Sequence, residues 1–282
     1  MASADPKLAK PLAATILATA LPGEVDGLDK AALAQAVDFM LATAGKRSSG
    51  KPNIAIDTFA DASGRLAMRI ALINDDMPFL VDSVAAALAA ANVAIERLIH
   101  PVVDVERDKS GNLTALSEKR GLTGNRESFI YVETSRIDAK ERRALAANLN
   151  AVLQDVRCAV TDWRKMQSAM AADADSLPDG EGAALMRWFI DGAMTVLAHE
   201  RIMGGSERVE RLGLARSSDV ALLSGESIIR ATRFFADGGE APLILKSSRV
   251  STVHRSVQLD ILVVPVREGG KLTGLSVTGG LW

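Results

Sequence analysis

The sequence holds a single cysteine among its 282 residues, so no internal disulfide can form. That usage fits a reducing compartment, and we expect a soluble, cytoplasmic protein. Lys and Arg number 33 against 35 Asp and Glu, which gives a net charge of -2. Because no basic excess is available to neutralise phosphates, nucleic-acid binding is not expected. No run of about eighteen apolar residues lacks a charge, so no membrane span is expected either.

Metal and thiol chemistry also find little support in the sequence. His100, His199 and His254 are widely separated and lack metal-ligand spacing to one another or to the cysteine. Cys158 lies in a predicted helix without a neighbouring histidine, which favours an inert buried thiol over a nucleophile. We therefore expect no metal site, and we interpret the histidines as polar side chains at strand ends.

The sequence shows no glycine-rich loop of the kind that holds a nucleotide. No Gly-x-Gly-x-x-Gly follows a predicted strand, and the pairs Gly204-Gly205 and Gly238-Gly239 are isolated in polar segments. Hydride transfer requires a cradle for the dinucleotide. We therefore expect this chain to bind no cofactor of its own and to carry no complete active site.

Hydrophobic periodicity predicts an α+β chain in four parts. Residues 1–50 form a helical segment, residues 51–172 an α+β domain, and residues 173–182 a linker rich in Asp and Gly. Residues 183–282 read as a second α+β unit that is mostly β and truncated at its end.

The order of elements within residues 51–172 predicts the fold of this domain. We expect the following order: strands at 53–59 and 66–74, a helix at 78–91, a strand at 93–106, a hairpin connection or mobile loop at 107–127, a strand at 128–134 and a long helix from 138. That is the ferredoxin-like βαββαβ pattern, in which two helices cover one face of an antiparallel sheet. Its last strand is not evident, and residues 53–59 are a candidate to take that place.

The densest polar feature lies between a predicted strand and a predicted helix. It comprises Asn74, Asp75, Asp76, Met77, Pro78, Phe79 and Asp82. The commoner explanation is helix capping, in which Asp75 or Asp76 accepts N–H groups, Pro78 occupies the first turn, and Asp82 is solvated. The alternative is a pocket whose helix N–H groups receive a carboxylate and whose aspartates receive the ammonium of an amino acid. Catalysis by the adjacent carboxylates ranks last, since nothing nearby supplies a nucleophile.

The second unit offers one further candidate, the segment Thr252-Val253-His254-Arg255. We interpret it first as a turn that connects two strands and exposes an arginine. The alternative is that His254 and Arg255 form an interdomain or intersubunit contact, because a motif carries no role by itself.

Several sequence blocks together resemble one enzyme family. They are NDDMPFLVDSV (74–84), LIHPVVDVERDKSGNL (98–113), ESFIYVE (127–133), AVTDWRKM (159–166) and SSRVSTVHRSVQLD (247–260). In this order they resemble the bacterial large-type NAD-specific glutamate dehydrogenases. The resemblance implies a parent enzyme that oxidises L-glutamate to 2-oxoglutarate and ammonia with NAD, whose catalytic and NAD-binding domains lie downstream.

The resemblance also implies what this part of such an enzyme does. The N-terminal part is similar to ACT-type regulatory domains, which often bind amino acids and associate with one another. The implied partners are the chain's own downstream catalytic domains, further copies in a homo-oligomer, and a free amino acid. One departure concerns Phe79, because ligand-binding ACT modules carry glycine directly after the proline of this loop. The resemblance assigns no catalytic residue to this chain.

Overall fold

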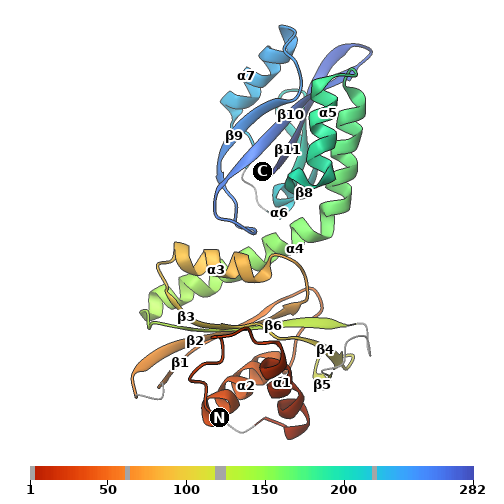
Figure 1. The fold of residues 1–282 in the computed structure, drawn as a ribbon. Coiled ribbons are helices and arrows are strands. Elements are labelled where there is room, and N and C mark those ends of the chain that lie inside the picture. The colour runs from red at the N-terminus through yellow and green to blue at the C-terminus, as the bar shows by residue number, and fades with distance from the viewer. Residues whose placement is uncertain (1–3, 61–63, 118–124, 218–220) are drawn as a thin grey trace. The chain divides into compact units, whose positions relative to one another are not determined.

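The computed structural model describes residues 4–60, 64–117, 125–217 and 221–282. The chain divides into two compact units, Met1–Leu153 and Gln154–Trp282 (Figure 1). The division lies within the long helix α4 (Ala139–Ser176), whereas the sequence predicts a linker at 173–182. That segment contains the end of α4, a short connection and the start of α5 (Glu181–Trp188).

Unit 1 is built on a six-stranded antiparallel sheet with the order β1-β2-β6-β4-β5, and β3 also pairs with β6. Its elements before α4 are α1 (Pro6–Thr19), α2 (Lys30–Ala44), β1 (Asn53–Ala60), β2 (Leu66–Asp75), α3 (Leu80–Ala90), β3 (Ile95–Ile99), β4 (Val102–Arg107), β5 (Leu113–Ser117) and β6 (Arg126–Thr134). The α+β class is confirmed, as are the predicted strands at 53–59, 66–74 and 128–134.

Two predictions for unit 1 need correction. The single strand expected at 93–106 is interrupted at His100 and Pro101, where proline supplies no N–H to a ladder, so that β3 and β4 are separate strands. The connection expected at 107–127 contains a strand, β5, while its residues 118–124 lie outside the described ranges.

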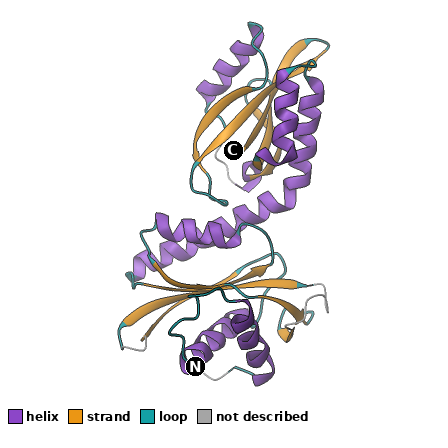
Figure 2. Cartoon of the chain, viewed as in Figure 1, coloured by secondary structure: helices purple, strands orange, loops and turns teal. Residues whose placement is uncertain are grey.

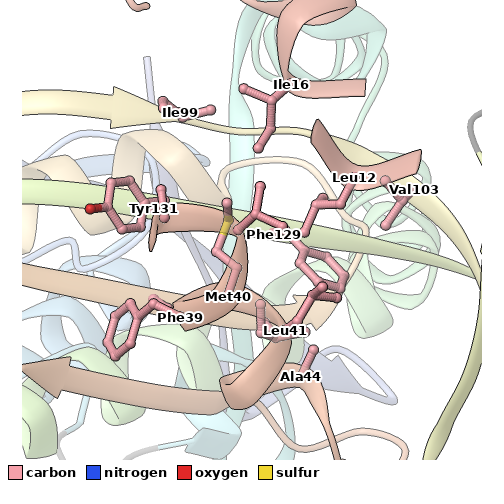
Figure 3. Close-up of a cluster of buried hydrophobic side chains, with 14 of the residues drawn as sticks. Leu12, Ile16, Phe39, Met40, Leu41, Ala44, Ile99, Val103, Phe129 and Tyr131 are labelled. Carbon is pink, nitrogen blue, oxygen red and sulfur yellow. The ribbon is translucent and has the colours of Figure 1, made fainter. Parts of the chain in front are cut away.

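Helices cover both faces of this sheet (Figure 2). On one face, α1 and α2 bury Leu12, Ile16 and Met40 against Phe129 and Tyr131 of β6 (Figure 3). On the other face lie α3 and the first part of α4 (Figure 1). Because β2 is covered on both sides, its residues from 67 to 74 are all buried. The helical segment at 1–50 therefore contributes to the core of unit 1.

Unit 2 contains a five-stranded antiparallel sheet with the order β8-β7-β11-β10-β9. Its elements after α5 are a π-helical turn η1 (Phe189–Ala193), β7 (Thr195–Met203), β8 (Glu207–Gly213), α6 (Leu214–Ser217), α7 (Gly225–Ala236), β9 (Leu243–Val250), β10 (Gln258–Glu268) and β11 (Lys271–Leu281). Strands β10 and β11 form a hairpin with a turn between Glu268 and Lys271. The largely polar segment between β7 and β9 contains β8, α6 and α7.

The core of unit 2 is formed where α4 and α5 lie on this sheet. Met170 of α4 and Met186 of α5 pack with Phe189, Leu262 and Val264. Across the described ranges, no helix is both long and apolar enough to cross a membrane.

Candidate functional site

A polar cleft in unit 1 has a volume of about 830 Å³. It is lined by the connection after α2, the end of β2, the β4–β5 hairpin and the start of β6; its residues are Arg47, Ser48, Ser49, Asp75, Asp76, Val105, Arg107, Asp108, Lys109, Ser110, Gly111, Asn125, Arg126 and Glu127. Asp75 and Asp76 belong to the candidate segment predicted from the sequence. The other five members of that segment are not among the described residues that line the cleft.

A buried carboxylate, Glu127, organises the wall of this cleft. The residue is 2% exposed, and both of its oxygens accept hydrogen bonds. Arg47 donates to it from Nε at 3.1 Å and from Nη2 at 2.6 Å. Arg107 donates from Nε at 2.7 Å and from Nη2 at 2.8 Å, which is the bidentate geometry favoured by guanidinium and carboxylate groups. Two guanidinium groups therefore compensate one buried negative charge.

The same two arginines tie the connection after α2 and the β4–β5 hairpin to the sheet. Arg47 Nη1 donates to the carbonyl oxygen of Lys51 at 3.0 Å, and Arg107 Nη1 donates to the carbonyl oxygens of Ala44 and Gly111. Burial acts to lower the pKa of Arg47, but its bonds to Glu127 and other carboxylates outweigh burial and raise it. The Arg47 guanidinium group therefore remains charged.

Asp75 and Asp76 each face an arginine across the cleft. Asp75 forms an ion pair with Arg47 at 2.5 Å, which supplies the second negative charge that this arginine cluster requires. Asp76 accepts a hydrogen bond from Ser128 Oγ at 2.8 Å and pairs with Arg126 at 3.3 Å. The positive and negative charges of the wall thus balance, and the cleft is polar but close to neutral.

Helix α3 starts later than the sequence predicted. It begins at Leu80, two residues after Pro78, and its N-cap position is Phe79 and not an aspartate. Phe79 has a φ of 70°, in the left-handed region that glycine normally occupies. This is the position at which ligand-binding ACT modules carry glycine. The backbone here has the conformation of a glycine, while the side chain is an aromatic ring.

The remaining members of the predicted segment lie around this helix start. Asn74 is buried at the end of β2, Met77 is half-buried, and Pro78 and Asp82 are exposed. Asp82 lies in the first turn of α3, where a negative charge is favourable. The segment is therefore divided between the cleft and the start of the helix.

The exposed rim of the cleft is a self-contained turn. Asp108 Oδ1 accepts hydrogen bonds from the backbone N–H groups of Ser110 and Asn112, and its Oδ2 accepts from the Asn112 side chain. The Asn112 side chain and these N–H groups lower the pKa of the Asp108 carboxyl. The carboxylates of the cleft are thus held by donors of the chain itself, and their charged and polar groups are suited to bind a polar molecule.

The polar groups buried in unit 2 lie elsewhere. His199 is fully buried on β7 and shares a hydrogen bond with Thr278 Oγ1 at 3.1 Å. Burial, together with the charge of Arg201, lowers the pKa of His199 to about 4, so the ring is neutral near pH 7. Cys158 is 3% exposed, and burial raises the pKa of its thiol. Neither group has the geometry of a nucleophilic site.

The segment around His254 connects β9 to β10, as the first interpretation of that motif predicted. Thr252 Oγ1 donates to Asp155 of α4 at 2.6 Å, and His254 adopts a φ of 66°. Arg255 is exposed. The contact role of His254 and Arg255 stays a prediction.

Within the described ranges, no group of three or more His, Cys, Asp or Glu side chains is arranged to hold a metal ion. The candidate residues predicted from the sequence do not include Arg47, Arg107, Arg126 or Glu127, four charged residues that line the cleft. They are separated by as many as 80 residues in sequence. Two of the resembling blocks contain Arg107 and Glu127, but no local pattern indicates that these residues pair.

The sequence of unit 1 is similar to that of one known protein family. Residues 12–149 match the family model described as "Glutamate dehydrogenase, ACT1 domain". The chain is 28% identical over 145 residues to the NAD-specific glutamate dehydrogenase of Halomonas elongata, covering 46% of this chain and 9% of that protein. The corresponding protein of Pseudomonas aeruginosa is 29% identical over 153 residues, covering 49% of this chain and 9% of that protein.

A third relative extends the similarity into unit 2. The NAD-specific glutamate dehydrogenase of Mycobacterium tuberculosis is 25% identical over 223 residues, covering 74% of this chain and 13% of that protein. The chain thus matches only 9% to 13% of the length of these curated relatives. A solved structure of an RNA-binding light-oxygen-voltage receptor matches with a TM-score of 0.21 and 12% identity, which is too low to assign a fold. Residues 12–149 therefore match the ACT1 domain of glutamate dehydrogenases, and the chain is similar to the N-terminal part of large NAD-specific glutamate dehydrogenases.

Proposed function

We propose that this chain is a non-catalytic segment of an NAD-dependent glutamate dehydrogenase and serves the assembly or the effector response of that enzyme. The parent reaction converts L-glutamate and NAD to 2-oxoglutarate, ammonia and NADH in the cytoplasm. The observation that carries the proposal is the match of residues 12–149 to the ACT1 domain of glutamate dehydrogenases. Glutamate chemistry and NAD then belong to domains outside this chain, which are its first partners.

The charges of the polar cleft in unit 1 support a structural role. Glu127 is held by Arg47 and Arg107, and these arginines also donate to backbone carbonyls of the end of α2, the connection after it and the β4–β5 hairpin. Such a network costs desolvation and is strongly destabilised when one partner is removed, so it favours one arrangement of the segments it joins. A rigid module of this kind is suited to hold neighbouring domains or subunits in place.

The sheet order supports a ferredoxin-like arrangement for unit 1. Strand β2, helix α3, strands β3 and β4, strand β6 and helix α4 follow one another along the chain. In the sheet, β1 lies beside β2 on the side away from β6, where the last strand of the ferredoxin-like motif would pair. We propose that β1, which precedes the motif in sequence, takes the place of that last strand.

The experiment that tests the proposed function compares the full-length enzyme with a variant lacking residues 1–153. We expect the deletion to change the number of subunits in the enzyme, or the dependence of the rate on free amino acids, while the catalytic domains still reduce NAD. A deletion variant with an unchanged number of subunits, an unchanged rate and an unchanged effector response would refute the proposal. A second deletion that removes residues 154–282 separates the contribution of unit 2.

The alternative function is an amino-acid sensor with its ligand at residues 74–82. The observation that favours it is the polar cleft of about 830 Å³, in which Asp75 and Asp76 face Arg47 and Arg126. These paired charges could exchange partners with the ammonium and carboxylate of a zwitterion.

Isothermal calorimetry of the 282-residue chain against a panel of free amino acids tests this alternative. A saturable heat that disappears in Asp76→Ala but persists in Asp26→Ala, on the α1–α2 connection, would support a sensor. No heat for any amino acid, with a folded chain, would refute the sensor function.

A separate experiment tests the predicted contact in unit 2. Arg255→Ala should weaken assembly of the parent enzyme, and unchanged assembly and activity would refute that contact.

A further inference from the structure

Two tryptophans meet on the surface of unit 2. Trp188 is 50% exposed and Trp282 is 57% exposed, and their ring centroids lie 6.3 Å apart with the rings at 90°. Apolar side chains that are exposed singly are common on proteins, whereas large apolar side chains that lie together on a surface mark a site of interaction. Tryptophan is also enriched among the residues that dominate binding energy at interfaces. We refer to Trp188 and Trp282 as the tryptophan pair.

The tryptophan pair lies on the core of unit 2. Buried Phe189 contacts both rings, with its centroid 5.2 Å from that of Trp188 and 5.1 Å from that of Trp282. Phe189 in turn packs with Met186 and Leu262 in the core. Aromatic rings at these separations, in tilted or edge-to-face orientations, attract one another. The two indoles are therefore held in place while both residues remain half exposed.

Regular secondary structure fixes the backbone of both tryptophans. Trp188 is the last residue of α5, and Trp282 directly follows β11. The backbone N–H of Trp282 donates to Oδ2 of Asp260 on β10 at 3.1 Å. Asp260 also pairs with Lys246 of β9 at 2.5 Å. The place of the tryptophan pair is thus set by a helix and by the sheet, so the pair presents a preformed apolar surface.

We propose that the tryptophan pair is the docking surface for the polypeptide that follows position 282 in the parent enzyme. The inference deepens the proposed function and rests on it, because the chain matches only 9% to 13% of the length of the related dehydrogenases. The occupant brings apolar side chains, since the surface that it removes from water consists of indole rings.

The strand pairing of unit 2 brings that polypeptide to the tryptophan pair. Strand β11 is an interior strand, with β7 on one side and β10 on the other. Leu281 of β11 lies opposite Thr195, the first residue of β7. Gly280 lies opposite Asp260, close to the start of β10. Both neighbouring strands start where β11 ends, so a chain that continues past Trp282 leaves the sheet beside the two indoles.

Covalent attachment favours this occupant over a separate molecule. A segment joined by a short linker has an effective concentration in the millimolar range, so it needs little intrinsic affinity to cover the tryptophan pair. A tryptophan buries about 150–250 Å² when it is fully covered, so each half-exposed residue still offers roughly 100 Å². A second copy or another protein would have to displace a segment that is always present.

Photo-cross-linking in the full-length enzyme identifies the occupant. With p-benzoylphenylalanine in place of Trp188, irradiation should attach this position to a peptide that lies after position 282 of the same chain, so the product keeps the mobility of a single chain on a denaturing gel. The matched control carries the same amino acid in place of Trp163, which is 44% exposed on α4 in the same unit, and should give severalfold less of this product. A product with the mass of two chains, or equal yields from both positions, would overturn the proposal.

Hydroxyl-radical oxidation, followed by mass spectrometry of the peptides, measures the same contact without a substitution. Trp188 and Trp282 should be oxidised severalfold more slowly in the full-length enzyme than in the 282-residue chain, whereas Trp163 should react at the same rate in both. Equal rates for the tryptophan pair in the two proteins would overturn the proposal. Protection that appears in the 282-residue chain as its concentration rises would also overturn it, because a second copy would then be the occupant.

The deletion experiments described above test the proposed function separately, through the number of subunits and the effector response. If the cross-link is absent while a deletion changes either property, the docking surface fails and the proposed function stands. If the cross-link forms while the deletions change neither property, the docking surface stands and the role in assembly or effector response fails.

Discussion

Asp173 offers a direct test of how burial controls charge in unit 2. It lies on α4 facing the sheet, is 5% exposed, and accepts a hydrogen bond from Ser276 Oγ of β11 at 2.6 Å. Burial raises the pKa of this carboxyl from 3.8 to about 6, although Ser276 and the charge of Arg201 act in the opposite direction. Glu210 adds to the rise. The folded chain therefore prefers the protonated form of Asp173 more than the unfolded chain does.

The size of the effect follows from the difference between the two pKa values. About two units correspond to about 3 kcal/mol of unfolding free energy, at 1.36 kcal/mol for each unit. Because the folded pKa is the higher one, this stabilisation is complete below pH 3.8 and is lost as the pH rises through about 6. Replacing Asp173 with asparagine removes the titration and keeps a side-chain oxygen for Ser276.

Urea unfolding followed by tryptophan fluorescence measures this difference in unit 2 alone, because Trp163, Trp188 and Trp282 all lie there. We expect Asp173→Asn to match the unmodified chain near pH 4 and to exceed its stability by about 3 kcal/mol near pH 7.5. The control is Asp175→Asn, two residues along the same helix, where the carboxylate is exposed and pairs with Arg187 at 3.1 Å. A stability difference for Asp173→Asn that does not change with pH, or that matches the control, would refute the reasoning.

Three further predictions follow from other buried positions. The ring of His199 should titrate near pH 4 when its NMR signals are followed; because its folded pKa is depressed, its contribution to stability is present above pH 6.5 and lost as the pH falls, and a midpoint near 6.5 would show that the ring is solvated. Glu127→Gln should destabilise unit 1 by about 3–5 kcal/mol in thermal or urea unfolding, because Arg47 is left buried beside a neutral amide; a cost near zero would mean that water replaces the carboxylate. Gly213→Ala should destabilise unit 2 far more than Gly270→Ala, although both glycines have positive φ, because a Cβ at position 213 would lie 2.2 Å from a carbonyl oxygen of β7 and one at position 270 meets nothing within 4 Å. Equal losses in the two glycine variants would assign the cost to backbone strain alone.

Much of unit 1 could be predicted from periodicity, because each element that was found carries its own apolar pattern. Leu66, Met68, Ile70 and Leu72 alternate as a strand does, and α4 repeats its apolar residues at helical spacing from Leu145 onward. By contrast, β8 alternates few apolar side chains and lies at the edge of its sheet, so the sequence gives it little hydrophobic signal.

The candidate site was predicted only in part, and the reason is sequence distance. The adjacent carboxylates Asp75 and Asp76 mark a polar segment by themselves. Their arginine partners, Arg47 and Arg126, lie 28 and 50 residues away. Arg126 reaches Asp76 because β6 is the neighbour of β2 in the sheet, whereas Arg47 reaches Asp75 from the connection after α2. No local pattern specifies which arginine meets which carboxylate, because that choice depends on strand order and register.

The sequence by itself determined the α+β class, most strand positions and the resemblance to large glutamate dehydrogenases, since these depend on local spacing and on blocks of contiguous residues. Only the tertiary structure decided that the first helices belong to the core of unit 1, that Glu127 is shared by two arginines, and that β1 is an edge strand of its sheet. Each of these depends on which elements lie side by side. That arrangement is fixed by packing and hydrogen bonding between segments far apart in the chain, whose energies no local pattern encodes.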